Sequence, residues 1–142
     1  MIRRHVFGAA LLAFATTLLP AMSAHAQTAP PAVTQGAANI KRTILQKMDV
    51  PGTSSEAITA LAEVVPGVQI DRHSHFGVES GYLVSDDFTV LVDGKPELVL
   101  KGGDSYQVLA GVARDGKSGP AGAKLVVTYI VEEGKPLATP AK

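Results

Sequence analysis

Two histidines and a glutamate stand close together near the middle of the chain: His73, His75 and Glu79. On a β-strand, residues two positions apart point to the same face and lie about 6.6–7 Å apart along it, so the two imidazoles can lean toward one ion. Glu79 follows Phe76-Gly77, where a hairpin can fold the chain back. Two neutral imidazoles and a carboxylate suit Zn²⁺, Mn²⁺ or Fe²⁺ and leave positions open for water, dioxygen or substrate. The pattern therefore predicts a mononuclear metal site, and its alternative is a chance His-x-His pair on a solvated strand.

The segments that would position these side chains have the pattern of a β-protein. After residue 66 no stretch shows the apolar period of a helix. Short apolar or alternating runs recur instead, separated by turn signals such as Asp93-Gly94. The expected strands cover residues 42–48, 57–65, 68–76, 81–84, 88–92, 97–100, 106–109 and 124–131. Many short strands joined by glycine-centred turns predict an all-β sandwich or barrel.

The N-terminal segment has the order of a secretory signal peptide. Arg3 and Arg4 precede the apolar residues 6–19, and Ala24-His25-Ala26 is typical of a cleavage site before Gln27. The apolar run is shorter than the roughly 20 residues that a membrane-spanning helix needs, which argues against a stable anchor. We expect a signal peptide over residues 1–26, a flexible linker over 27–39, a barrel domain over 40–137 and a tail over 138–142. The mature protein is accordingly expected to be periplasmic or secreted.

Composition narrows the chemistry further. The 142 residues fit one domain, and the chain has no Cys, which excludes disulfides, thiolate nucleophiles and zinc-thiolate sites. Its 13 basic and 13 acidic residues balance, and removal of Arg3 and Arg4 with the leader gives the mature chain a net charge of −2. No strongly basic run remains, so nucleic acid is not an expected partner.

Three stretches resemble the cupin superfamily. Residues 67–79 read GVQIDRHSHFGVE, similar to the first cupin motif, in which a glycine precedes His-x-His and a glutamate. Residues 103–111, GDSYQVLAG, resemble the start of the second motif, and residues 129–136, YIVEEGKP, resemble the end of small, single-domain exported bacterial cupins. The resemblance implies an antiparallel jelly-roll β-barrel with a divalent metal ion (Zn, Mn or Fe) inside. It also implies that His73, His75 and Glu79 are its ligands.

The second motif departs from the family pattern at its most important position. Arg114 stands where cupins usually have a fourth ligand, a histidine, and Leu109 stands where proline is usual. A guanidinium stays protonated and has no lone pair to give a metal. Three arrangements remain open. Arg114 turns outward and leaves a three-ligand site, or it turns inward and pairs with Glu79 in place of the metal, or it binds a substrate carboxylate beside the metal.

Residues 111–118, GVARDGKS, match the phosphate-loop pattern GxxxxGK[ST]. That loop needs a helix directly after it, and Gly119-Pro120-Ala121-Gly122 cannot start one, so a glycine-rich connection between two strands is expected there. Two function classes follow from the whole sequence: a metalloenzyme acting on a small organic molecule, and a non-catalytic module that binds a small ligand or a partner. A homodimer is expected from the resemblance, with residues 42–48 able to add to a neighbour's sheet edge.

Overall fold

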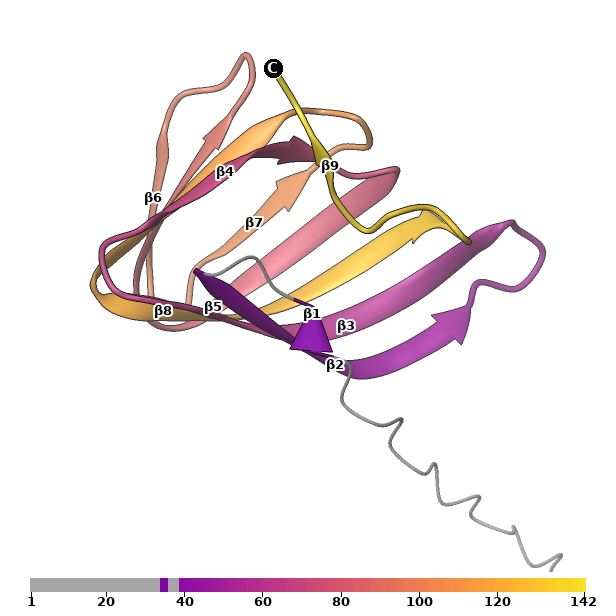
Figure 1. Cartoon of the computed structure of the whole chain (residues 1–142), viewed down its shortest axis with the longest axis horizontal. Coiled ribbons are helices and arrows are strands. Elements are labelled where there is room, and N and C mark those ends of the chain that lie inside the picture. Colours follow the sequence, from indigo (N-terminus) through magenta and orange to yellow (C-terminus); the bar gives the residue numbers. More distant parts are fainter. Residues whose placement is uncertain (1–33, 36–38) are drawn as a thin grey trace, which may run out of the picture.

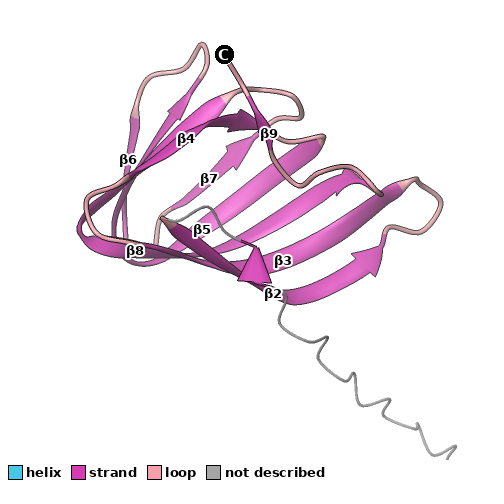
Figure 2. Ribbon diagram, in the orientation of Figure 1, coloured by secondary structure: helices cyan, strands magenta, loops and turns pink. Residues whose placement is uncertain are grey.

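The computed structural model describes residues 34–35 and 39–142, and it contains strands and no helix within them (Figures 1 and 2). The strands are β1 (Thr34–Gln35), β2 (Ile40–Asp49), β3 (Ser55–Val64), β4 (Gln69–Ser74), β5 (Gly77–Val92), β6 (Leu98–Lys101), β7 (Ser105–Val108), β8 (Arg114–Glu132) and β9 (Thr139–Pro140). All strand pairs are antiparallel. The predicted all-β jelly-roll barrel is therefore confirmed.

Two long strands, β5 and β8, hold the barrel together (Figure 1). They pair along most of their length, but each half has different outer neighbours. The C-terminal half of β8 lies beside β3 and the N-terminal half of β5, whereas its N-terminal half lies beside β4 and the C-terminal half of β5. Strand β7 extends the first group and β6 the second. Strands β5 and β8 are therefore shared by both sheets, and each of them runs from one sheet into the other.

Strand β5 turns this corner at a bulge around Asp86. The register against β8 shifts on both sides of it, and Asp86 has a φ of 68°, a left-handed conformation that aspartate tolerates better than most residues. Residues 81–84 and 88–92, expected as two strands, therefore form one bent strand. The separate hairpin expected at Asp93-Gly94 is present, with Gly94 at a φ of 71° and Lys95 N–H donating to Val92 O at 3.0 Å.

The core lies between the two sheets and follows from strict alternation along the strands. Every second residue of β3 is buried, from Glu56 to Val64, and so is every second residue of β8 from Leu125 to Val131. The buried apolar side chains are Ile40, Ile58, Ala60, Ala62, Val64, Leu83, Phe88, Val90, Leu100, Tyr106, Val108, Ala123, Leu125, Val127, Tyr129 and Val131. Fully burying each larger one contributes about 1.5–3 kcal/mol, so this interior is what holds the site residues in place.

Two sequence expectations need correction. Residues 114–120 are the start of β8 rather than a glycine-rich connection, because Gly116 lets the strand cross directly over the ring of Phe88, which a side chain there would meet. Strands β4 and β5 do not form a hairpin either: β4 pairs with β8 and β9, so the chain between His75 and Gly77 passes from one sheet to the other. Neither tertiary arrangement leaves a local pattern in the sequence.

The structure tests the predictions for the two ends of the chain to different extents. The expected signal peptide, residues 1–26, and most of the expected linker lie outside the described residues, although β1 falls within the linker and pairs with Arg42 and Thr43. The expected tail contains β9, whose residues Thr139 and Pro140 pair with β4. In residues 34–35 and 39–142 no helix is long and apolar enough to cross a membrane.

Beyond Thr43, the outer edge of β2 has no strand partner among the described residues. Leu45 and Met48 on this edge are exposed. The homodimer stays a prediction.

Candidate functional site

Four buried polar residues meet at one end of the barrel interior. His73 lies near the end of β4, and His75 directly follows that strand. Glu79 lies on β5, and Arg114 is the first residue of β8, directly opposite His73 in the strand pairing. Their exposed fractions are 6%, 4%, 2% and 4%. The structure thus brings together all four residues that the sequence singled out.

Arg114 points inward and joins the other side chains. Its Nη2 donates to Oε2 of Glu79 and to Nε2 of His75, the latter at 2.7 Å. On its other side Glu79 accepts a hydrogen bond from the hydroxyl of Tyr106 at 2.5 Å. The carboxylate is therefore held by a cation on one oxygen and a phenol on the other. Of the three arrangements that the sequence left open, the geometry is that of the second.

Backbone carbonyls fix the tautomers of both histidines. Nδ1 of His73 lies 2.6 Å from the carbonyl oxygen of Asp71, and Nδ1 of His75 contacts that of Leu137. A carbonyl only accepts, so each Nδ1 carries the proton and each Nε2 offers a lone pair. His75 Nε2 uses it to accept from Arg114, whereas His73 Nε2 is buried without a partner among the described residues.

Both imidazoles are neutral at pH 7. Burial, and then the positive charge of Arg114, lower the pKa of His73 and of His75 to about 4. His75 Nε2 and Glu79 Oε2, 2.8 Å apart, are consequently two acceptors sharing the guanidinium donor and not an ion pair of their own. Burial lowers the pKa of Arg114 to about 10, which leaves it charged at neutral pH.

This donor set does not fit a metal ion in the observed arrangement. Nη2 of Arg114 lies within hydrogen-bonding distance of both His75 Nε2 and Glu79 Oε2, and it occupies the place from which a metal would have to coordinate them. At an effective dielectric constant of about 20, a dication 4 Å from this cation would be repelled by about 8 kcal/mol. In the described part of the chain, no group of three or more His, Cys, Asp or Glu side chains is placed to hold a metal.

The interior beside Arg114 is nearly full. The inner cavity, between Glu79, Tyr106, Arg114 and the apolar core, has a volume of about 20 Å³. That is room for about one water molecule, so a ligand carboxylate does not fit against Arg114 there. Tyr106 is the residue of this site whose role the sequence reasoning missed. Its place within residues 103–111, which resemble the second cupin motif, was a signal that the sequence offered for it.

A larger outer pocket of about 280 Å³ opens between β2, β4 and the C-terminal segment. Its lining residues are Asn39, Ile40, Arg42, Gln69, Ile70, Asp71, Arg72, His73, Ala138 and Pro140. Arg42 lines both this outer pocket and the inner cavity, and its Nε is buried with no partner in the described part of the chain. Nothing in the local sequence distinguished Arg42, because only the pairing of β2 with its neighbours places it there.

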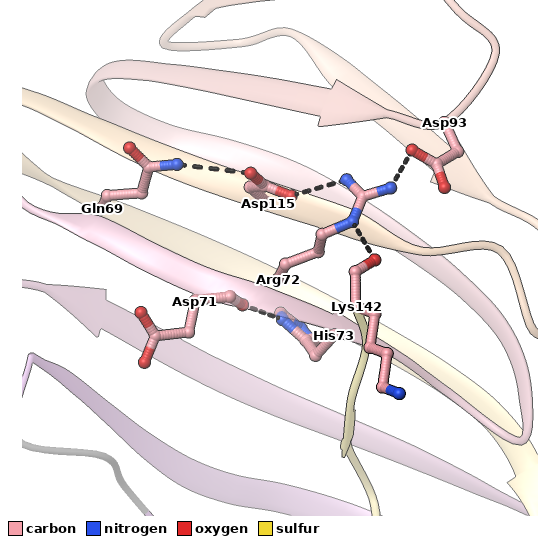
Figure 3. A network of polar contacts seen from close by, with 7 residues as sticks. All are labelled: Gln69, Asp71, Arg72, His73, Asp93, Asp115 and Lys142. Carbon is pink, nitrogen blue, oxygen red and sulfur yellow. Dashed lines mark hydrogen bonds and ion pairs between the residues drawn. The ribbon is translucent and has the colours of Figure 1, made fainter.

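Hydrogen bonds and ion pairs around Arg72 hold the C-terminal segment in place beside this pocket (Figure 3). Arg72 Nε donates to the carbonyl of Lys142 at 3.0 Å, and the same guanidinium pairs with Asp115, at 3.1 Å, and with Asp93. Ala141 N–H in turn donates to the carbonyl of Arg72 at 3.1 Å. Segments far apart in the sequence are thereby joined around β4, and the wall formed by Ala138 and Pro140 is held in position.

Comparison with solved structures identifies the architecture. The chain is similar to an RmlC-like cupin from Shewanella frigidimarina (22% identity, 72% of this chain and 86% of that one, TM-score 0.57). It is also similar to the DMSP lyase DddQ from Ruegeria pomeroyi (13%, 78% and 61%, TM-score 0.65) and to oxalate decarboxylase from Bacillus subtilis (12%, 85% and 34%, TM-score 0.62). The chain thus spans only part of the two enzymes. No family model matches it, and no curated protein matches its sequence.

Proposed function

Starting from a chain with the cupin fold, we propose that it is a binding module for a small organic molecule and works without a metal ion in its barrel. The observation that carries this proposal is the inward guanidinium of Arg114, bonded to Glu79 and His75. An arginine in that place offers charge and hydrogen-bond donors but no Lewis acidity. The module therefore binds and orients a ligand, and the barrel lacks the group that would activate water or dioxygen.

The test is metal content. The protein would be purified without chelator or histidine tag, soaked separately with Zn²⁺, Mn²⁺ and Fe²⁺, desalted and measured by mass spectrometry. We expect far less than one equivalent of any of these metals in the wild type. Arg114→His supplies an imidazole and removes the competing cation, so we expect it to gain close to one equivalent, and a triple variant with His73→Ala and His75→Ala to lose it again.

A matched control is Lys124→His, because Lys124 is exposed on β8, the strand that also carries Arg114, and its loss also removes one positive charge. Metal uptake by this control would mean that any added histidine recruits metal nonspecifically. Near-stoichiometric metal in the wild type, lost on replacing His73 and His75, would overturn the proposal.

A metalloenzyme acting on a small organic molecule is the second candidate, and one observation favours it. Both histidines donate Nδ1–H to a backbone carbonyl and keep a lone pair on Nε2, the arrangement that commonly orients metal-binding imidazoles. His73, His75 and Glu79 would be its ligands once Arg114 moved away. The wild-type metal measurement separates the two candidates directly.

We also propose that the protein is exported, on the strength of the leader-like residues 1–26. The test is the mass and N-terminal sequence of the protein recovered from the periplasm or medium of an expressing bacterium. A mature chain beginning near Gln27 supports export, and a full-length chain retained in the cytoplasm argues against it.

A further inference from the structure

One outer face of the barrel carries no charged side chain over three rows of residues. The sheet behind it consists of β2, β3, β8, β5 and β7, side by side in that order (Figure 1). Residues paired across neighbouring strands lie on the same face. The residues of these rows, called the uncharged face below, are Thr43, Gln46 and Met48 of β2, Ala57, Thr59 and Leu61 of β3, Val126, Thr128 and Ile130 of β8, Val78, Ser80 and Tyr82 of β5, and Ser105 and Gln107 of β7. Met48, Tyr82 and Ile130 are 63%, 50% and 44% exposed, so no described segment covers them.

The outer face of the other sheet has the opposite character. Its charged side chains are Arg72, Asp87, Lys101, Asp115 and Lys117. Ion pairs join Lys101 to Asp87 at 2.7 Å and Arg72 to Asp115 at 3.1 Å. That face is suited to water, whereas an exposed face that stays uncharged and largely apolar over several strands is typical of an interaction surface. The uncharged face is therefore where a macromolecular partner is expected.

The pattern along β8 shows which partner fits. Its outward residues are, in order, Lys124, Val126, Thr128, Ile130 and Glu132. Apolar residues thus flank Thr128 on both sides, and opposite charges stand at the two ends. At one end Glu63 is shared between Lys41, at 3.7 Å, and Lys124, at 3.5 Å, which leaves one positive charge in excess. At the other end Glu132 is exposed and has no ion-pair partner in residues 34–35 and 39–142.

We infer that the uncharged face binds a second copy of this chain, with the two sheets face to face and their strands antiparallel. A twofold axis that runs across the strands at Thr128 brings Val126 of one copy opposite Ile130 of the other. The same axis brings Lys124 opposite Glu132. Packed sheets lie about 10 Å apart, a distance that the long side chains of lysine and glutamate can span together. The excess charges at the two ends then neutralise each other.

This axis also suits the neighbouring strands. On β3 it brings Leu61 opposite Ala57, and on β5 it brings Tyr82 opposite Val78. In both cases a larger side chain meets a smaller one, which allows the two faces to interdigitate. The middle row meets its own copy, and its side chains are hydroxyls and amides that can both donate and accept hydrogen bonds: Gln46, Thr59, Thr128, Ser80 and Gln107.

The area of the face matches what a stable dimer needs. Five strands about 4.8 Å apart and five rows about 6.8 Å apart, from the row of Lys124 to that of Glu132, cover roughly 800 Å². A specific interface of standard size buries about 800 Å² per partner. This pairing leaves the edge of β2 beyond Thr43 uncovered, and it does not depend on what the barrel binds.

The experiment measures the oligomeric state of the purified protein by analytical ultracentrifugation and native mass spectrometry at low ionic strength. We expect the wild type to be a dimer at micromolar concentration. Lys124→Glu places glutamates opposite each other at both ends of the pair, and Glu132→Lys places lysines there, so each variant is expected to weaken dimerisation at least about tenfold. An equimolar mixture of the two variants brings opposite charges together again and is expected to form the mixed dimer.

Two matched controls lie on the outer face of the other sheet. Lys117→Glu makes the same change of charge on the same strand as Lys124→Glu, and it is expected to leave the dimer intact. Thr128→Arg brings two guanidiniums together at the axis and is expected to give a monomer, whereas Thr89→Arg on β5 is expected to stay dimeric. Far-UV circular dichroism checks that each variant is folded.

A monomeric wild type would overturn the inference. A dimer that persists in Thr128→Arg would also overturn it, since the contact would then lie elsewhere, for example at the edge of β2. The same holds if the two charge variants stay apart when mixed, because the antiparallel arrangement requires them to pair. None of these outcomes alters the metal content of the protein, which tests the proposed function separately.

Discussion

Replacing Glu79 by glutamine removes one charge from the barrel interior and leaves its shape intact. Glutamine is nearly isosteric with glutamate, and its amide can still accept from Arg114 while its NH₂ group faces the Tyr106 oxygen. What is lost is the negative charge beside a guanidinium that is 4% exposed. Removing one partner of a buried ion pair costs about 3–5 kcal/mol, because the other charge stays buried and uncompensated.

This loss is large against the total stability of a domain, about 5–15 kcal/mol. For a domain of about 100 residues, a loss of 4 kcal/mol lowers Tm by roughly 15–30 °C. The chain has no Trp, so urea and thermal unfolding are best followed by far-UV circular dichroism. A double variant, Glu79→Gln with Arg114→Met, removes both charges and is expected to recover most of the loss, since well-packed apolar replacements of buried ion pairs are often neutral.

The control for Glu79→Gln is Glu63→Gln. Glu63 makes comparable ion pairs at the surface, with Lys41 at 3.7 Å and Lys124 at 3.5 Å. Exposed pairs contribute about 0–1 kcal/mol, so we expect a change within that range. If Glu79→Gln proved no more destabilising than Glu63→Gln, the buried pair with Arg114 would not exist in solution, and the argument for a metal-free barrel would fail with it.

Three further measurements test the same interior. Because the folded-state pKa of His73 and of His75 is about 4 and the unfolded value about 6.5, the unfolded state binds more protons between these pH values. The stabilisation from these neutral histidines is therefore fully present above about pH 6.5 and falls as the pH drops toward 4, by about 3 kcal/mol for one histidine. The free energy of unfolding measured across this range should no longer depend on pH in this way in a variant with both histidines replaced by glutamine. Tyr106→Phe deletes the hydrogen bond to the buried carboxylate and is expected to cost about 1.5–3 kcal/mol in urea unfolding. Gly116→Ala forces a methyl group into the ring of Phe88 and is expected to cost about 1–3 kcal/mol, whereas Gly102→Ala, whose new carbon would meet its nearest atom at 3.5 Å, should change little.

Local pattern was enough to predict most of the fold. Alternation over residues 57–65 and 124–131 corresponds to β3 and to the C-terminal half of β8, because a strand with one buried face must alternate. The turn at Asp93-Gly94 was readable for the same reason, since its geometry depends on only a few adjacent residues. The N-terminal half of β8 could not be predicted from local pattern, because Gly116 approaches Phe88 and Gly119 approaches Asp87, both of which lie far away in sequence.

The residues of the site also fall into those that the sequence predicted and those that it did not. Spacing alone put His73 and His75 on one face and placed Glu79 near them, and the resemblance to cupins identified Arg114 as the residue in the position of the usual fourth ligand. Whether Arg114 turns inward depends on the buried acceptors around it, which a one-dimensional pattern does not contain. Arg42 could not be found at all, because its importance comes from an unpaired Nε and from its place between two cavities.

The net charge at this end of the barrel can be compared between a metal-bound arrangement and the observed one with Arg114 turned inward. With both histidines neutral, a dication bound to Glu79 beside Arg42 would give a net charge of +2, whereas Arg114, Glu79 and Arg42 together give +1. The net charge is therefore positive in either case, and in the observed arrangement the charge without an ion-pair partner among the described residues is that of Arg42, which lines both the inner cavity and the outer pocket. A guanidinium has no vacant coordination position, so under the proposed function the barrel would hold a ligand through charge and hydrogen bonds and would not polarise it as a metal ion does. For this reason, binding of a small molecule is the first property to measure in this protein.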